Sequence, residues 1–230
     1  MSEQFDLVII GAGPGGYSTA LRAAELGMKV ALVERDATVG GTCLNRGCIP
    51  SKALITATHT IDTVHRAAEL GVNASVNGID FGTLRDYRLR VVKTMVGGLA
   101  GLLAHRGITV FRANAAFHAD ETAPATSNHI VHLVSSPDQS DILTYHKADV
   151  PEPSGPTMDL TATNIVIATG AKPRPLPGNP FAGALIDSTQ ALEVNEFPSS
   201  AVIIGAGAIA LEFASMWNAA GSKVTLLIRK

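Results

Sequence analysis

The fold of this chain is decided by the stretch Val8-Ile9-Ile10-Gly11-Ala12-Gly13-Pro14-Gly15-Gly16. An apolar run that begins at Phe5 leads into it, and a helical pattern over residues 17–26 follows it. A strand, glycines in G-x-G-x-x-G spacing and a helix, in this order, are typical of a β-α-β motif that binds a dinucleotide. The stretch therefore predicts an α/β fold with a parallel sheet.

Each position of this fingerprint has a physical task. Gly11 permits a tight turn, Gly13 lets a pyrophosphate approach the backbone, and Gly16 lets the helix pack closely on the strand. The helix N-terminus then offers oriented N–H groups to the phosphates. Glu34 ends the next apolar run and is predicted to accept a hydrogen bond from a ribose hydroxyl. Glycines that serve tight packing alone are the alternative. The residues predicted to bind the nucleotide here are Gly11, Gly13, Pro14, Gly15, Gly16 and Glu34.

A second copy of the same pattern lies near the other end of the chain. The apolar run Ala201–Ile204 leads into Gly205, Gly207 and Ala210, where alanine replaces the third glycine. A helical stretch, a glycine and another apolar run follow at the spacing of the first copy. One fingerprint alone is a weak signal, but two in matching context predict two nucleotide-binding motifs.

The second copy differs at the position equivalent to Glu34. Ile228 stands there, followed by Arg229 and Lys230. An acidic residue repels a ribose 2′-phosphate, whereas an apolar residue beside arginine accommodates one. The pattern favours NADP over NAD, with Arg229 as a phosphate ligand. A solvated charge at the end of a strand is the alternative for Arg229.

The chain between the two copies predicts both helices and antiparallel strands. The expected elements are helices over 52–70 and up to Leu103, a strand over 107–117, antiparallel strands and loops over 118–160, a buried strand over 164–168, and a proline-rich connection over 172–180. We therefore predict one domain over residues 1–180 and the start of a second over 181–230. A lone β-α-β motif cannot bury both faces of a parallel sheet, so we expect the chain to be a piece of a longer protein.

The composition narrows the class of function. A net charge of −2 gives no general attraction to nucleic acid or to anionic membranes. The basic positions Arg85, Arg88, Arg90 and Lys93 are expected on a solvated helix face. No apolar stretch is long enough to span a bilayer, and we expect no signal peptide before the first strand. With only two cysteines, we expect a reducing compartment, the cytoplasm.

Both cysteines lie in Gly40-Gly41-Thr42-Cys43-Leu44-Asn45-Arg46-Gly47-Cys48-Ile49. In a regular helix this spacing gives a rise of about 7.5 Å, whereas a disulfide needs Cα atoms roughly 4.4–6.8 Å apart. A bridge between Cys43 and Cys48 therefore requires a broken turn, and Gly47 is the expected break. Two buried thiols, a static disulfide and a zinc site are the alternatives. The zinc site lacks further ligands at metal spacing, so no metal is predicted.

Together with Pro50-Ser51-Lys52, this segment resembles the redox-active disulfide signature of the flavin-dependent pyridine nucleotide–disulfide oxidoreductases. It is most similar to the dihydrolipoamide dehydrogenase type. The resemblance implies a three-layer ββα domain that binds FAD, with an antiparallel β-meander beside its parallel sheet. It adds Gly41, Thr42, Lys52 and the segment Ala168-Thr169-Gly170 to the FAD-binding residues. It implies catalytic roles for Cys43, Cys48, Lys52 beside the flavin and Glu212 near the nicotinamide.

The same resemblance implies the chemistry and the partners. A substrate dithiol attacks Cys43, Cys48 becomes the thiolate against the flavin, and electrons reach NAD or NADP through FAD. Dihydrolipoamide is the expected substrate, a homodimer the expected full-length state, and a 2-oxoacid dehydrogenase complex a candidate partner. The family's dimerisation domain, with the His–Glu base that serves the other subunit, is absent here, so this chain alone is expected to be inactive. An NADPH-dependent reductase of the glutathione or mercuric type and a non-catalytic FAD-binding module are the alternatives.

Overall fold

The computed structural model describes residues 3–117, 129–135 and 157–228. The chain divides into two compact units. The first unit comprises Met1–Asn45 and Lys93–Ala171, and the second comprises Arg46–Val92 and Lys172–Lys230. Helix α4, Phe81–His105, runs through the boundary at residues 92 and 93.

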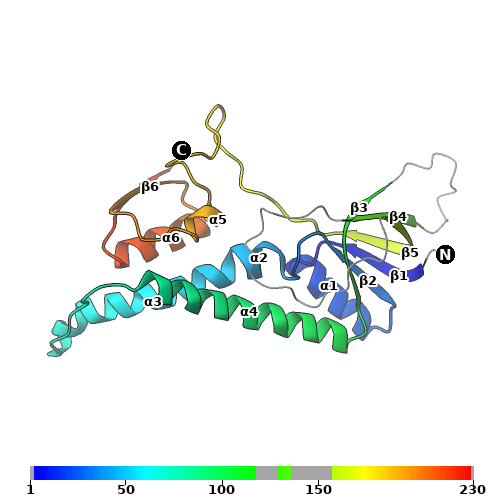
Figure 1. The fold of residues 1–230 in the computed structure, drawn as a ribbon, viewed down its shortest axis with the longest axis horizontal. Coiled ribbons are helices and arrows are strands. Elements are labelled where there is room, and N and C mark those ends of the chain that lie inside the picture. Colours follow the sequence, from blue (N-terminus) through cyan, green and yellow to red (C-terminus); the bar gives the residue numbers. More distant parts are fainter. Residues whose placement is uncertain (1–2, 118–128, 136–156, 229–230) are drawn as a thin grey trace. The chain divides into compact units, whose positions relative to one another are not determined.

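A closed five-stranded sheet forms the centre of the first unit (Figure 1). Its strands are β1 (Glu3–Ile10), β2 (Val30–Glu34), β3 (Thr109–Ala116), β4 (His129–Ser135) and β5 (Thr157–Ile167). Strand β1 lies parallel to both β2 and β5, and β2 lies parallel to β3. Strand β4 runs antiparallel to β3 and β5 and closes the sheet. The predicted parallel sheet and antiparallel meander are confirmed.

Strand β5 is longer than the sequence predicted. Its second half pairs with β1, but it begins at Thr157, before the predicted start at Asn164. Leu160 and Ala162 are fully buried and pair with both β1 and β4, which extends the strand. Most of the predicted antiparallel region, residues 118–128 and 136–156, lies outside the described residues.

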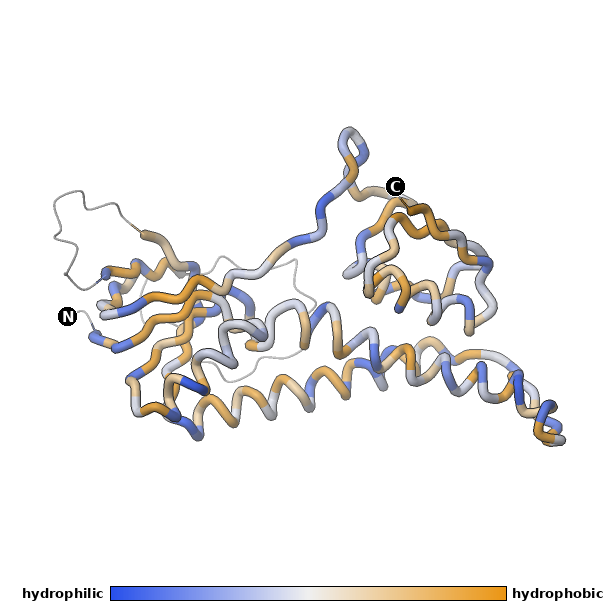
Figure 2. Tube along the Cα trace, turned by 180° about the vertical axis from the view of Figure 1, so that it is seen from behind, coloured by the Kyte–Doolittle hydropathy of each residue, from blue (hydrophilic) through white to orange (hydrophobic). Residues whose placement is uncertain are grey.

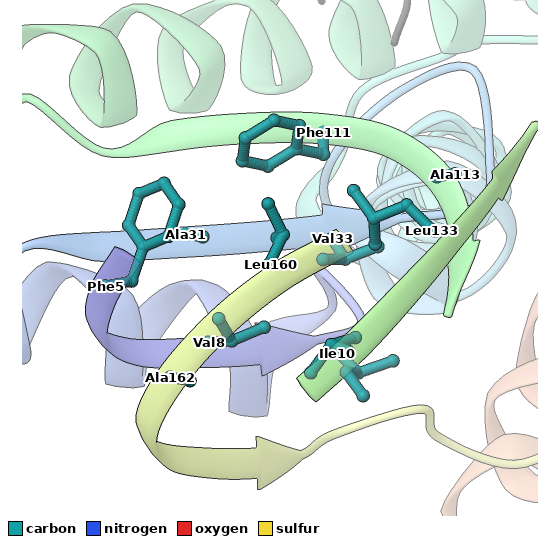
Figure 3. Close-up of a cluster of buried hydrophobic side chains, with 11 residues drawn as sticks. Phe5, Val8, Ile10, Ala31, Val33, Phe111, Ala113, Leu133, Leu160 and Ala162 are labelled. Atoms are coloured by element: carbon teal, nitrogen blue, oxygen red, sulfur yellow. The ribbon is translucent and has the colours of Figure 1, made fainter. Parts of the chain in front are cut away.

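The two faces of β1 pack against different apolar clusters, which explains its unbroken apolar run. Val8 and Ile10 point into the closed sheet, where they meet Phe5 and Phe111 (Figure 3). The two phenylalanine rings pack edge to face with centroids 6.0 Å apart. Ile9 and its neighbours on the other face pack with apolar residues of helices α1 and α4. Figure 2 shows this apolar character along the strands of the first unit.

Helix α1, Pro14–Glu25, lies where the sequence predicted a helix but begins three residues before the predicted start at Tyr17 and ends one residue before Leu26. Pro14 occupies the first turn, where its missing N–H costs no hydrogen bond. Gly13 is the N-cap and leaves the first N–H groups without a side-chain cap. At the other end Gly27 has φ +82° and its N–H donates to the Ala24 carbonyl, as expected for a C-terminal glycine.

The second unit joins helices from both halves of the chain. Its elements are α3 (Cys48–Arg66), the short 3₁₀ helix η1 (Ala67–Leu70), α5 (Ser188–Ala191), β6 (Ser200–Ile204), α6 (Ala208–Ala219) and β7 (Lys223–Leu227). Helix α3 packs on α6, and Leu54 shares an apolar cluster with Phe213, Met216 and Trp217. Strands β6 and β7 form the predicted parallel pair, with α6 connecting them.

One prediction about the second unit is wrong. Arg88 on α4 was expected on a solvated face with its basic neighbours, but its side chain is only 3% exposed. Its guanidinium donates to the Leu192 carbonyl and forms a two-pronged ion pair with Glu193 at 2.5 and 2.9 Å. Residues more than a hundred positions away supply these partners, so local charge pattern did not reveal them.

The outer face of the β6–β7 pair is apolar and exposed. Val202, Ile204 and Leu227 lie on it with more than half of their surface accessible. This agrees with the expectation that a lone β-α-β motif covers one face only. The predicted domain boundary at residue 180 falls inside the second unit, and the assignment of 1–180 and 181–230 as two domains stays a prediction. Within the described ranges no helix has both the length and the apolar character needed to span a bilayer.

Candidate functional site

The first glycine turn is sterically tight where it meets the end of β5. Gly11 has φ +100°, and a Cβ placed on it would lie 2.4 Å from the Ala168 carbonyl oxygen. A Cβ on Gly16 would lie 1.7 Å from the Gly11 carbonyl oxygen. Only glycine fits at either position, so the turn and helix α1 approach each other as the fingerprint predicted.

The segment Ala168-Thr169-Gly170 lies directly beside this turn. The Ala168 N–H donates to the Ile10 carbonyl at 2.8 Å, and a Cβ on Gly11 would lie 3.1 Å from the Thr169 Cα. Gly170 has φ +76°, where glycine is favoured. Two segments that the sequence separates by about 150 residues thus form one edge of the sheet.

Space remains at Gly13, the N-cap of α1. Its backbone is extended, with φ −71° and ψ −177°, and a Cβ there would meet only the Gly41 Cα, at 3.8 Å. The uncapped N–H groups of the first turn face no side-chain acceptor within the described residues. A helix N-terminus with these features accepts a pyrophosphate, so the residues fit the predicted dinucleotide.

Glu34 ends β2 beside the same turn and is 8% exposed. Its two carboxylate oxygens accept the Ala12 N–H and the Asp36 N–H, each at 2.8 Å. Burial raises the pKa of Glu34 above its ordinary value, although the two N–H donors oppose that rise. Each oxygen keeps a lone pair, so the carboxylate can also accept a ribose hydroxyl.

The loop that precedes the first cysteine is fastened to the glycine turn. The Gly40 N–H donates to the Ala12 carbonyl at 2.8 Å, and Gly41 is so near that a Cβ on it would lie 2.7 Å from the Gly13 Cα. Gly41 begins helix α2, Gly41–Arg46, in which Thr42 is exposed. The predicted cofactor residue Gly41 therefore lies at the entrance of the pyrophosphate position.

Two polar residues of this loop were not predicted. Asn45 is 5% exposed, accepts the Thr38 hydroxyl at 2.9 Å, and donates to the Val39 and Gly41 carbonyls at 3.1 and 3.0 Å. Thr38 is likewise buried. The signal available in the sequence was the asparagine itself, two residues after Cys43, since asparagine favours turns and caps over helix interiors.

The two cysteines flank a break in the helix. Helix α2 ends at Arg46 and α3 begins at Cys48, with Gly47 between them, as the cysteine spacing required. Both cysteines are thiols, Cys43 partly buried and Cys48 exposed. The disulfide that would join them stays a prediction.

In the second unit, Lys52 and Glu212 form an ion pair. The Lys52 Nζ lies 2.6 Å from Glu212 Oε1, and the Ser51 hydroxyl lies 3.2 Å from Glu212 Oε2. The same hydroxyl lies 3.1 Å from the Cys48 carbonyl oxygen. Two predicted catalytic residues, from α3 and α6, are therefore in direct contact, and Ser51 is a third partner that the sequence did not indicate.

The second glycine turn repeats the backbone of the first. The Gly205 N–H donates to the Leu227 carbonyl at 2.8 Å, as the Gly11 N–H does to the Val33 carbonyl at 2.7 Å. Its N-cap, Gly207, has φ −76° and ψ 177°, close to the values at Gly13. Cβ positions on Gly205 and Gly207 have no neighbour within 4 Å, so this turn is open.

The nucleotide preference of the second turn depends on the residues after β7. Ala210 occupies the first turn of α6, equivalent to Gly16. Ile228 is 67% exposed at the position equivalent to Glu34. The predicted phosphate ligand Arg229 lies outside the described residues.

Comparisons with known proteins agree with this arrangement. The family of pyridine nucleotide–disulphide oxidoreductases matches residues 5–230. Dihydrolipoyl dehydrogenase of Geobacillus stearothermophilus is 37% identical over 222 residues, which are 96% of this chain and 42% of that protein. The enzyme of Thermus scotoductus is 38% identical over 226 residues, or 98% of this chain and 42% of that protein. The chain thus spans under half the length of these relatives.

Two solved structures share the fold. LpdA from Mycobacterium tuberculosis matches with a TM-score of 0.78 at 23% identity, over 98% of this chain and 44% of that one. The Cu(II) complex of the C43S mutant of the HOCl-induced flavoprotein disulfide reductase RclA from Escherichia coli matches with a TM-score of 0.70 at 28% identity, over 99% of this chain and 43% of that one. The chain belongs to the pyridine nucleotide–disulphide oxidoreductase family.

Proposed function

We propose that this chain is the FAD-binding part, with the start of the nicotinamide nucleotide site, of a flavin-dependent disulfide oxidoreductase of the dihydrolipoamide dehydrogenase type. One observation carries the proposal. The loop that leads into Cys43 is bonded to the glycine turn, through Gly40 to Ala12 and through the close approach of Gly41 to Gly13. The segment that carries Cys43, the first of the two cysteines, is therefore attached to the dinucleotide cradle within the first unit.

The proposed FAD site uses the residues of the first turn. Gly13 leaves room for the pyrophosphate, and the first N–H groups of α1 donate to it. Glu34 accepts the adenosine ribose hydroxyl, and the segment from Ala168 to Gly170 supplies backbone beside the turn. Bound FAD would supply two-electron transfer between the cysteine pair and a nicotinamide nucleotide.

The proposed dithiol step is an exchange of sulfur bonds. A substrate thiolate attacks Sγ of Cys43, the Cys43–Cys48 bond breaks, and Cys48 leaves as a thiolate. The second substrate thiolate attacks the substrate sulfur of the mixed disulfide and releases Cys43 as a thiolate. The substrate becomes a disulfide, and its two electrons remain on the cysteine pair. Cys48 is the more exposed thiol, so the order with Cys43 attacked first rests on the family resemblance rather than on exposure.

Lys52 and Glu212 are proposed to act on the nucleotide side of the reaction. Their contact holds a cation and an anion together at 2.6 Å, with the lysine 56% and the carboxylate 30% exposed. Ser51 fixes the second carboxylate oxygen, so the orientation of Glu212 is set from two sides. A cation and an anion held in this orientation are suited to stabilise charge that develops during hydride transfer.

The remaining assignments are also proposals. Ile228 leaves the ribose position of the second turn without an acid, which supports use of NADP as well as NAD. Dihydrolipoamide is the proposed dithiol and a 2-oxoacid dehydrogenase complex the proposed source of it. The full-length protein is proposed to be a homodimer in the cytoplasm, in which the second subunit supplies the His–Glu base that acts on the dithiol.

Reduction of a thiol-bound metal ion is the second candidate function. The match to a flavoprotein disulfide reductase whose C43S mutant was solved as a Cu(II) complex favours it. Soft thiolates select Cu(I), the product of such a reduction, and Cys43 and Cys48 are the thiols of this chain. NADPH-dependent Cu(II) reduction without dihydrolipoamide oxidation would select this candidate over the first.

Substitution of Gly13 by alanine tests the proposed FAD site. The added methyl meets one neighbour at 3.8 Å, an ordinary contact, and the extended backbone accepts alanine. Folding should therefore be unchanged, while the methyl occupies the space for the pyrophosphate. We expect wild-type unfolding in urea and at least about tenfold weaker FAD binding, measured by flavin fluorescence. The matched Gly207→Ala variant should bind FAD as the wild type does. Equal FAD binding by Gly13→Ala would remove the proposed site.

A further inference from the structure

Asn45 is a buried amide that the proposed reaction does not use. It lies between the two cysteines in the sequence, two residues after Cys43 on helix α2. Its amide group uses three of its four hydrogen-bonding positions, one to the Thr38 hydroxyl and two to the Val39 and Gly41 carbonyls. A side chain that satisfies three buried groups of one loop determines the shape of that loop.

The loop fixed by Asn45 is the same loop that is attached to the dinucleotide cradle. Gly40 and Gly41 have φ +106° and +55°, values that favour glycine. Gly40 donates to the Ala12 carbonyl, and Gly41 touches Gly13. Backbone contacts at Gly40 and Gly41 thus join the cradle to the loop whose Val39 and Gly41 carbonyls Asn45 holds.

The same helix turn carries Cys43. The Leu44 N–H donates to the Gly40 carbonyl, and Leu44 is buried against the Gly40 backbone. Any movement of Gly40 and Gly41 therefore moves the backbone on both sides of Cys43. The path from Gly13 to Cys43 consists of neighbouring contacts inside one compact unit, as physical coupling requires.

We propose that Asn45 is a positioning residue that transmits occupancy of the dinucleotide cradle to Cys43, so that the reactivity of this thiol depends on a bound pyrophosphate. The inference rests on the proposed function, because it takes the cradle to be a dinucleotide site. In a chain without a bound dinucleotide, Cys43 would then be held less rigidly, and its thiol would react more readily with oxidants other than the substrate.

ADP is the probe that separates this effect from flavin chemistry. It has the pyrophosphate and the adenosine ribose of the dinucleotide but no flavin ring, so it cannot exchange electrons with either sulfur. The reduced 230-residue chain is treated with iodoacetamide with and without saturating ADP, and mass spectrometry gives the alkylation rate of Cys43. ADP binding is measured separately by calorimetry. In the wild type we expect ADP to slow the alkylation of Cys43 by about fivefold.

The variants remove the link at Asn45. Asn45→Ala and the same-shaped Asn45→Asp should still bind ADP, yet the Cys43 rate should no longer respond to it. Thr38→Val should weaken the response, and Thr38→Ser, which keeps the hydroxyl, should restore it. Thr58→Val is the matched control, because it deletes a fully buried hydroxyl whose acceptor is the Ile55 carbonyl of its own helix. Its Cys43 should respond as the wild type does.

Each outcome decides the inference. An Asn45→Asp or Thr38→Val chain that binds ADP and still shows the wild-type response would overturn it. So would a wild-type chain that binds ADP without any change at Cys43. If the wild-type chain bound neither ADP nor FAD, the proposed function would fall, and the inference with it.

Discussion

Gly16→Ala should destabilise the first unit although it improves helix propensity. The new Cβ would lie 1.7 Å from the Gly11 carbonyl oxygen and 3.5 Å from Cγ2 of Ile9. Because the obstacle is backbone, the helix must shift by more than about 1 Å to bring that contact to an ordinary distance. The shift would displace Ala20 and Ala23 of α1 from the apolar cluster that they share with Ile9 and Leu32.

The magnitude follows from two opposing terms. Overpacking of a tight contact costs about 1–3 kcal/mol, and a backbone obstacle belongs at the upper end of that range. Replacing glycine by alanine inside a helix returns about 1 kcal/mol. We therefore expect a net loss of about 2 kcal/mol in the free energy of unfolding, a substantial part of the stability of a small domain.

The second turn offers an internal control, because Ala210 already occupies the position equivalent to Gly16. Ala210→Gly should cost at most about 1 kcal/mol, from helix propensity alone. Urea unfolding followed by circular dichroism measures both variants. A Gly16→Ala chain within about 0.5 kcal/mol of the wild type would refute the argument that this contact is sterically closed.

Three further changes test other parts of the structure. Arg88→Met should lower the free energy of unfolding by about 3 kcal/mol in a thermal melt, because it leaves the Glu193 carboxylate and the Leu192 carbonyl without their buried donor; equal melting would refute this. Burial raises the pKa of the Glu34 carboxyl group, so the folded chain binds a proton there more tightly than the unfolded chain does. The stability that this bound proton contributes is therefore lost as the pH rises above 4.5. Glu34→Gln should remove that slope in urea unfolding between about pH 4 and pH 7, and an unchanged slope would contradict the assignment. Asp187→Ala should lower the free energy of unfolding by about 1 kcal/mol in the same urea assay. The Asp187 carboxylate accepts the N–H groups of Thr189 and Gln190 at the start of α5, and the Gln190 side chain accepts the Asp187 N–H in return. Unfolding equal to that of the wild type would show that this cap adds no stability.

The sequence predicted those features that depend on local backbone chemistry. Glycines at fixed spacing after an apolar run predicted both turns, because few other residues allow φ near +100° or so close a backbone approach. The break at Gly47 followed from the disulfide geometry that two cysteines five positions apart would need. The apolar run of β1 predicted a strand buried on both faces.

Features made by distant residues were not predicted. The sequence predicted antiparallel strands, but not that β4 pairs with both β3 and β5 and so closes the sheet. Arg88 meets Glu193 across more than a hundred residues, and Ser51 meets Glu212 across 161. Asn45 is only a few residues from its partners, but its burial depends on how the loop folds onto the turn at Gly13.

The most direct test of the proposed function is a visible spectrum of the longest FAD-loaded form of the protein, recorded before and after anaerobic dihydrolipoamide. A cysteine thiolate in contact with the flavin ring gives a long-wavelength charge-transfer absorption that neither group has alone. The account predicts that this band appears on reduction and is absent from the Cys48→Ser variant, while Ser51→Ala, which keeps both thiols, retains it. A protein that binds FAD but shows no such band with dihydrolipoamide would contradict the proposal that its cysteines and flavin form one redox centre.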